Sequence, residues 1–232
     1  MSTAIVIAID GPSGSGKSSV SRGVARALGL EYLDTGAMYR AATWWCLEQG
    51  VPLTDIEAVA AQVRALPLVM GVDPADPTVH VGGVDVGAAI RETAISSAVS
   101  AVATNLEVRA ELGRLQRAAI QAAREDGSRG IVAEGRDITT VVAPDADVRV
   151  LLTASEEARL ARRAKELHGS ADADAVEATR DQVLRRDADD STVVQFHVAA
   201  DGVVTVDSSH LDLDQTVQAV LDVVESVVGP RA

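Results

Sequence analysis

Apolar residues along this chain form short unbroken runs that alternate with segments of helical periodicity. The runs are Ala4–Ile9, Leu30–Leu33, Ile131–Ala133, Val148–Leu152 and Val203–Val206. A strand buried on both faces has an uninterrupted apolar sequence, and alternation with helices is typical of a parallel sheet. The pattern therefore predicts an α/β fold, with a five-stranded parallel sheet and helices on both faces.

Two of the expected helices carry clear start signals. Asp212 and Gln215 have the spacing of a capping pair, ahead of an apolar stripe that includes Leu213, Val217, Val220, Leu221 and Val224. A second helix is expected to begin near Ser155, because Glu156 and Glu157 would then lie in its first turn, where the helix dipole favours acidic residues.

Two stretches depart from this alternation. Residues 65–91 hold short β-like runs separated by Asp73-Pro74-Ala75-Asp76-Pro77 and by Gly82-Gly83, which are strong turn signals. They predict a small antiparallel β insert. Residues 159–190 are charged and helical in pattern, and they are expected to form a mobile lid. The α/β core would then comprise residues 1–64, 92–158 and 191–232.

Between the first strand and the first helix lies the sequence Gly-Pro-Ser-Gly-Ser-Gly-Lys-Ser, residues 11 to 18. Its spacing is that of a phosphate-binding P-loop, in which glycines let successive backbone N–H groups point at an anion. Lys17 can reach the outer phosphates, and the Ser18 hydroxyl can ligate Mg²⁺. The motif predicts a P-loop NTPase-type fold that binds ATP through Gly11, Pro12, Ser13, Gly14, Ser15, Gly16, Lys17, Ser18 and Ser19.

The composition excludes several classes of partner. The net charge of −13 argues against a nucleic-acid polymer as partner, because counterion release needs a basic face. No apolar stretch approaches the roughly 20 residues of a membrane span, and no signal peptide is recognisable. The single cysteine, Cys46, cannot form an intramolecular disulfide and is expected in the core. We expect a cytoplasmic monomer that does not bind membranes.

Polar clusters follow two of the predicted strands. Asp34 and Thr35 follow the second, and Glu134-Gly135-Arg136-Asp137 follows the run Ile131–Ala133. Ligands of open α/β sheets bind at the carboxyl ends of the strands, so these residues are expected to face the P-loop. An acid there could order the Mg²⁺ shell, and Arg136 could hold a phosphate. In the lid, Arg186 could stabilise charge on a transferring phosphoryl group.

The motifs occur in the order and spacing of bacterial cytidylate kinases. They are the P-loop, then Leu33-Asp34-Thr35-Gly36-Ala37-Met38-Tyr39-Arg40, then Glu134-Gly135-Arg136-Asp137, then Arg186-Asp187 with Asp190-Ser191. The β-type insert also resembles that family, whereas adenylate kinases carry a helical acceptor domain. The similarity covers about residues 5–228. It implies an ATP- and Mg²⁺-dependent kinase that phosphorylates CMP and dCMP.

The resemblance also implies a role for particular side chains. Arg40 and Arg136 would hold the acceptor phosphate, with Asp34 and Thr35 beside them. Ser100, Arg109 and Asp137 would read the cytosine base, and Arg186 with Asp190 would contact the sugar. Lys17, Arg136 and Arg186 are the predicted catalytic groups.

The chain departs from the family pattern at two places. The family's lid sequence Asp-Ser-x-Arg is here Asp190-Ser191-Thr192-Val193, and Gln195-Phe196-His197-Val198 replaces a usual Pro-Leu pair. Thr139 stands where a glycine is common. Because Val193 replaces the arginine of the family's lid sequence, one expected substrate contact is missing. Arg185 is the nearest residue that could supply the positive charge of that arginine.

Two alternatives remain open at this level. One is a kinase for another small acceptor, such as UMP, AMP or a non-nucleotide alcohol. The other is a nucleotide-binding regulator without turnover. A guanine-specific switch protein is disfavoured, because neither Lys17 nor Lys165 lies in an Asn-Lys-x-Asp motif.

Overall fold

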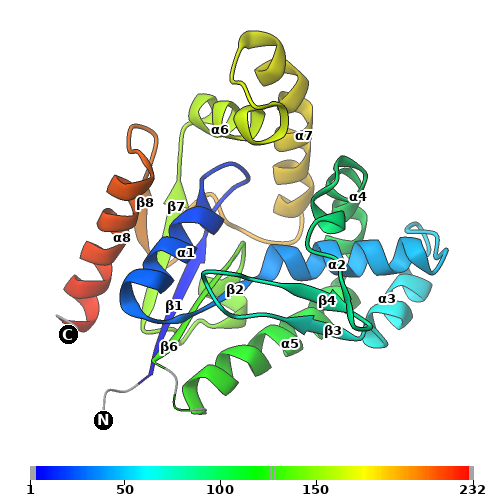
Figure 1. Ribbon diagram of the computed structural model, residues 1–232, viewed down its shortest axis with the longest axis horizontal. Coiled ribbons are helices and arrows are strands. Elements are labelled where there is room, and N and C mark those ends of the chain that lie inside the picture. Colours follow the sequence, from blue (N-terminus) through cyan, green and yellow to red (C-terminus); the bar gives the residue numbers. More distant parts are fainter. Residues whose placement is uncertain (1–3, 126, 128, 230–232) are drawn as a thin grey trace.

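A five-stranded parallel sheet forms the centre of the molecule, with the strand order β2-β6-β1-β7-β8 (Figure 1). The structure is a computed structural model that describes residues 4–125, 127 and 129–229. The strands are β1 (Ile5–Asp10), β2 (Glu31–Asp34), β6 (Gly130–Gly135), β7 (Val148–Thr153) and β8 (Val204–Asp207). Each coincides with a predicted apolar run to within a few residues, so the predicted sheet is confirmed.

Successive residues of β1 enter two different cores, one on each face of the sheet. Ile5, Ile7 and Ile9 pack with residues of α1 (Lys17–Leu28) and α8 (Leu213–Val228). Val6 and Ala8 pack with α5 (Leu106–Glu125) and with η2, a single π-helical turn over Ile138–Val142. All six residues of β1 are buried, which explains why its sequence is apolar throughout.

Three further helices extend the core beyond β2. They are α2 (Thr35–Glu48), α3 (Ile56–Arg64) and α4 (Thr93–Ala103). Their apolar faces and that of α5 form a separate cluster that contains the fully buried Cys46, as expected from its sequence context. This cluster supports one wall of the cavity described below.

The predicted β insert is present as a three-stranded antiparallel sheet, β3 (Leu68–Met70), β4 (Val79–Val81) and β5 (Val84–Asp85). A 3-10 turn, η1 (Ala89–Arg91), leads back to the core. The loop between β3 and β4 is bound to α1, because Arg22 donates from Nε to the Pro74 carbonyl oxygen at 3.0 Å and from Nη2 to that of Ala75 at 3.1 Å. The insert is thus joined to the helix that follows the P-loop.

Two antiparallel helices, α6 (Glu156–His168) and α7 (Ala173–Ser191), form the predicted lid and lie above the P-loop in Figure 1. The side chain of Ser155 caps α6, and Asp212 with Gln215 forms a capping box at the start of α8. Both predicted helix starts are therefore confirmed. The exact boundaries of core, insert and lid stay predictions.

No helix within residues 4–125 and 129–229 combines the length and the apolarity that crossing a membrane would require.

Candidate active site

The P-loop connects β1 to α1, and two of its glycines adopt backbone conformations that other residues rarely adopt. Gly14 and Gly16 have φ angles of 76° and 88°. A Cβ atom on Gly14 would lie 2.6 Å from the backbone oxygen of Arg159 in the lid. The loop therefore needs glycine both for its curvature and for the close approach of α6.

Lys17 extends across this loop, where its ammonium group donates to the carbonyl oxygen of Pro12 at 2.8 Å. Burial lowers the pKa of Lys17 to about 8, and the positive charge of Arg136 acts in the same direction. Glu134 partly opposes this shift. An amine whose charged form is this poorly solvated favours the arrival of anionic phosphates.

Glu134, at the end of β6, provides the acidic side of the same region. It accepts a hydrogen bond from the Tyr32 hydroxyl at 2.7 Å. Burial and the neighbouring Asp34 raise the pKa of Glu134, while Lys17 and the Ser18 hydroxyl lower it. The Ser18 hydroxyl and the Glu134 carboxyl group therefore lie close together where the P-loop meets α1.

Oxygen ligands of this kind suit Mg²⁺, which usually takes one or two protein ligands and completes its shell with phosphate oxygens and water. Among the described residues there is no group of three or more His, Cys, Asp or Glu side chains that could hold a metal by itself. The donor set of Ser18 and Glu134 therefore fits a cation that arrives with a nucleotide.

A cavity of about 1030 Å³ lies between the P-loop, the insert and the lid. Most of the predicted site residues line it: Ser13, Gly14, Ser15, Gly16, Lys17, Ser18, Ser19, Asp34, Thr35, Arg40, Arg109, Arg136, Asp137, Arg186 and Asp190. Residues from five separate stretches of the chain thus meet at the carboxyl ends of the strands, as the sequence predicts.

Three arginines around the cavity each keep one buried nitrogen without a hydrogen-bond partner among the described residues. These atoms are Nε of Arg40, Nη1 of Arg136 and Nε of Arg186. Burial lowers the pKa of Arg186 to about 10, with Arg136 and Arg40 contributing through like-charge repulsion. Buried donors without a hydrogen-bond partner are costly, so three such cationic side chains on one cavity wall favour the binding of an anion there.

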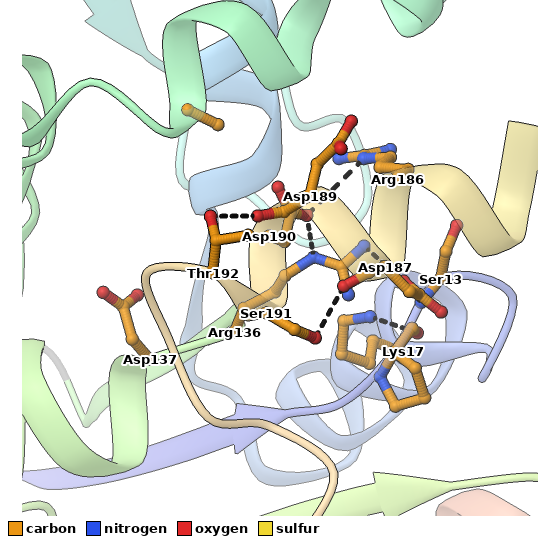
Figure 2. Close-up of polar contacts among 12 residues, drawn as sticks. Ser13, Lys17, Arg136, Asp137, Arg186, Asp187, Asp189, Asp190, Ser191 and Thr192 are labelled. Carbon is orange, nitrogen blue, oxygen red and sulfur yellow. Dashed lines mark hydrogen bonds and ion pairs between the residues drawn. The ribbon is translucent and has the colours of Figure 1, made fainter.

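Asp187 of α7 joins the lid to the P-loop (Figure 2). It accepts from the Ser13 backbone N–H at 3.0 Å and from Nη2 of Arg136 at 2.9 Å, and it also pairs with Arg159. Burial alone would raise the pKa of Asp187, but these donors hold it below its usual value. One carboxylate therefore ties together the lid, the phosphate loop and the predicted phosphate-binding arginine.

Asp137 and Arg109, predicted to read the base, form an ion pair at the far end of the cavity. The guanidinium of Arg109 lies over the ring of Tyr39, 5.7 Å from its centroid. The pair offers a carboxylate acceptor and several guanidinium donors at one point.

Other predicted residues have structural partners. The Thr35 hydroxyl donates to the backbone oxygen of Glu134 at 2.7 Å, which joins the start of α2 to β6. Asp34 caps α2 through the N–H of Ala37 and pairs with Arg40 at 3.1 Å. Asp34 therefore both caps α2 and lines the cavity.

The structure does not bring every predicted residue to the cavity. Gly11 and Pro12 are buried behind the loop and do not line it. Ser100 is half-buried and is also absent from the lining, because the face of α4 that meets the cavity carries Ser96, Val99 and Ala103.

Arg185 is exposed and lies outside the cavity lining, so the structure gives no support to its expected role as the substitute for a lid arginine. Arg186 lies inside, since adjacent helix residues point about 100° apart.

Sequence reasoning did not assign Asp187, Arg159, Tyr39 or Phe196 to the site. Asp187 directly follows the predicted site residue Arg186 in the sequence, and this adjacency could have identified it. The aromatic ring of Phe196 lies on Arg136, with the guanidinium carbon 4.4 Å from the ring centroid. No local signal in the sequence points to that contact.

Comparison with known proteins identifies the family of this chain. A family model described as cytidylate kinase matches residues 7–226. A cytidylate kinase of Streptomyces avermitilis is 50% identical over 223 residues, which cover 96% of this chain and 93% of that protein. The corresponding figures for the Streptomyces coelicolor cytidylate kinase are 51%, 96% and 93%, and for that of Cutibacterium acnes 49%, 97% and 98%. A match of this extent, over a chain whose P-loop, insert and lid surround a cavity lined by arginines, shows that the chain belongs to the cytidylate kinase family.

Proposed function

We propose that this chain transfers the γ-phosphoryl group of ATP to CMP and dCMP, forming CDP and dCDP. Family membership over nearly the whole chain supports this activity. The observation that carries it is the group of buried arginines Arg40, Arg136 and Arg186 on the wall of a P-loop cavity, each with one guanidinium nitrogen that has no hydrogen-bond partner among the described residues. A regulator that binds nucleotide without turnover would not require a second anion site beside the first.

The donor nucleotide would bind with its phosphates on the P-loop. The N–H groups of residues 13 to 18 and the start of α1 would face the phosphate oxygens. Lys17 would exchange its bond to the Pro12 carbonyl for a bond to the outer phosphates. Mg²⁺ bound near Ser18 would neutralise charge on the phosphate oxygens.

The acceptor phosphate would lie opposite, held by Arg40 and Arg136. Because a phosphate monoester is already an anion, the reaction needs no general base. Catalysis then consists of holding donor and acceptor in line and stabilising the charge that develops between them. The buried Arg186 is placed to do this from the lid.

Arg109 and Asp137 would select the base. The amino group of cytosine donates a hydrogen bond that the Asp137 carboxylate can accept, and the cytosine carbonyl accepts one from Arg109. Uracil carries an oxygen where cytosine carries the amino group, and that oxygen would face the carboxylate. The pair is therefore expected to favour CMP over UMP.

A coupled ADP-release assay with a panel of nucleoside monophosphates tests the proposal. CMP and dCMP are expected to support turnover well above UMP and AMP, with an absolute requirement for a divalent cation. Lys17→Ala supplies the inactive control. ADP formation that is independent of any acceptor, or a preference for AMP, would contradict the proposal. Monomeric state and cytoplasmic location stay predictions.

A further inference from the structure

The guanidinium group of Arg136 is held by two carboxylates and an aromatic ring. Its Nε donates to Asp190 at 2.6 Å and its Nη2 to Asp187 at 2.9 Å, so two lid carboxylates define the in-plane orientation of the guanidinium group (Figure 2). The third nitrogen, Nη1, is buried and has no partner among the described residues. Arg136 lines the cavity in which the proposed function places the acceptor phosphate.

One face of the same guanidinium is covered by an aromatic ring. The guanidinium carbon of Arg136 lies 4.4 Å from the centroid of Phe196, whose side chain is only 1% exposed. A cation over an aromatic face is attracted by the ring quadrupole, most strongly where water is excluded. Phe196 is the only phenylalanine in the 232-residue chain.

The segment after α7 is folded so that this ring reaches the site. The N–H of Val194 donates to the carbonyl oxygen of Asp190 at 3.1 Å, which turns the chain back at the end of the lid helix. The ring nitrogen of His197 lies 3.1 Å from the hydroxyl of Ser191, and that hydroxyl donates to the backbone oxygen of Asp187. The Phe196 backbone is thus attached to the same turn of α7 that supplies the carboxylates.

We infer that Phe196 is a positioning residue for Arg136: its ring fixes the plane of the guanidinium group while Asp187 and Asp190 bind two of its nitrogens, so that the group keeps one orientation at the cavity where the phosphates would bind. The inference rests on the proposed function for the role of Arg136. It also accounts for Val193. Arg40, Arg136 and Arg186 already bring three positive charges to the wall of this cavity. An uncharged ring orients Arg136 without adding a further cation.

The single phenylalanine allows a test that leaves the shape of the site nearly unchanged. Biosynthetic replacement of phenylalanine by 4-fluoro- and 3,4,5-trifluorophenylalanine changes only position 196 in this chain. Fluorine withdraws electron density from the ring face and weakens its attraction for a cation, but it does not reduce the apolar character of the ring. A ring that served only as core packing would tolerate the series.

We expect kcat/KM for CMP to fall stepwise along the series. The total loss should be about 2- to 30-fold, which corresponds to the range of exposed to desolvated cation–π contacts. The KM for ATP should stay within about twofold, because the P-loop does not depend on the ring. A value of kcat/KM that is flat across the series, at unchanged melting temperature, would overturn the inference.

Repeating the fluorination series in an Arg136 variant shows whether the ring acts through Arg136. In Arg136→Gln, which removes the cation and keeps a polar side chain, the dependence of CMP affinity on fluorination, measured by calorimetry, should disappear. A dependence that persists there would mean that the ring acts on something else. Val198→Ala is the matched control in the same segment, since Val198 is 79% exposed, and it should leave kcat and both KM values unchanged.

The ¹⁹F resonance of 4-fluorophenylalanine at position 196 separates this inference from the proposed function. If the unmodified chain showed no acceptor-dependent turnover, the proposed function would fail. The resonance should nevertheless shift when Arg136 is replaced by Gln, because that contact does not depend on the identity of the ligand. A resonance indifferent to the Arg136 substitution would overturn the stacking role whatever the activity.

Discussion

At the scale of single residues, the polar groups of the site form hydrogen bonds and ion pairs with one another. Lys17 donates to a carbonyl oxygen of its own loop, Asp187 accepts a hydrogen bond from the backbone N–H of Ser13, and Asp137 forms an ion pair with Arg109. Each of these contacts satisfies a group that a nucleotide could satisfy instead. Ligand binding is therefore an exchange of partners, and the exchange has measurable consequences for protonation and for selectivity.

Lys17 should take up a proton when ATP binds at alkaline pH. Burial lowers its pKa to about 8 in the free protein, so the amine is mainly neutral at about pH 9. Bound phosphates raise the pKa again, and the amine becomes protonated. Calorimetry in buffers of different ionisation enthalpy should show close to one proton taken up at about pH 9 and little uptake at about pH 7.

Lys17→Ala is the control for that measurement. It should abolish the proton uptake and reduce phosphoryl transfer by at least about 100-fold, the usual effect of losing one group that stabilises developing charge. Uptake that survives in this variant would assign the titration to another residue.

Asp137→Asn should damage discrimination between bases more than ATP binding. Replacing the carboxylate by an amide removes a charge-assisted hydrogen bond worth about 1.5–3 kcal/mol and releases Arg109 from its ion pair. The ratio of kcat/KM for CMP to that for UMP should fall about 10- to 100-fold. Asp145→Asn, the same change in an exposed residue paired with Arg124, should leave the ratio alone. If the ratio were equal in both variants, Asp137 would not contact the base.

At the scale of elements, the end of β1 is fastened to the loop that carries Arg136 and Asp137. Asp10 accepts from the N–H of Ile138 at 2.9 Å, and from the N–H and hydroxyl of Thr139 at 2.8 and 2.6 Å. The hydroxyl belongs to the position where the family commonly has glycine. Burial raises the pKa of Asp10 to about 6, and the hydrogen bonds from Thr139 act against that rise.

Thr139→Gly should therefore lower the free energy of unfolding in a pH-dependent way. Above about pH 6 Asp10 is ionised in the folded state, and the lost hydroxyl bond to a carboxylate should cost about 1.5–3 kcal/mol. Below that pH the folded carboxyl binds a proton more tightly than the unfolded one, whose pKa is near 4, so the bond matters less.

Denaturant unfolding at about pH 7.5 and pH 5 measures this difference. The penalty of Thr139→Gly should be larger at the higher pH, and Thr139→Ser, which keeps the hydroxyl, should recover most of it. A penalty that is equal at both values would mean that the hydroxyl does not act through the Asp10 carboxylate.

At the scale of the whole molecule, lid and insert are both attached to the segment that binds ATP. The lid is attached through Asp187 to the P-loop, and the insert through Arg22 to the helix after it. Donor and acceptor ligands would therefore contact one connected assembly. Binding one should organise groups, Arg136 among them, that the other also uses.

Thermal and denaturant unfolding with CMP and a non-hydrolysable ATP analogue should show this coupling. Each ligand at about 100 times its Kd should add about 2.7 kcal/mol to the free energy of unfolding, and both together at least the sum. The Lys17→Ala variant should lose most of the ATP contribution and keep that of CMP. A combined effect clearly below the sum would mean that the two ligands compete for one site.

The sequence by itself determined those features that depend on local physics. Strand burial appears as continuous apolar runs such as Ala4–Ile9, and the helix starts at Ser155 and Asp212 depend on side chains within three residues of their partners. The P-loop needs glycine at particular positions because of its own backbone angles, and parallel strands bring their carboxyl ends together. These rules were enough to predict the fold and the P-loop side of the cavity, whereas Arg109 and Asp190 were expected only from the family resemblance.

Only the tertiary structure decided which side chains line the cavity and which of their atoms lack a protein partner. That Ser96 rather than Ser100, one helical turn further on, lines the cavity depends on how α4 is placed against its neighbours, and the exposure of Arg185 depends on the rotation of α7. Phe196 and Arg136 lie 60 positions apart, yet they meet at 4.4 Å because the chain folds back after the lid. Periodicity and spacing describe neighbours along the chain. Contacts between distant segments are set by packing, and packing leaves the nitrogen of Arg136 without a partner.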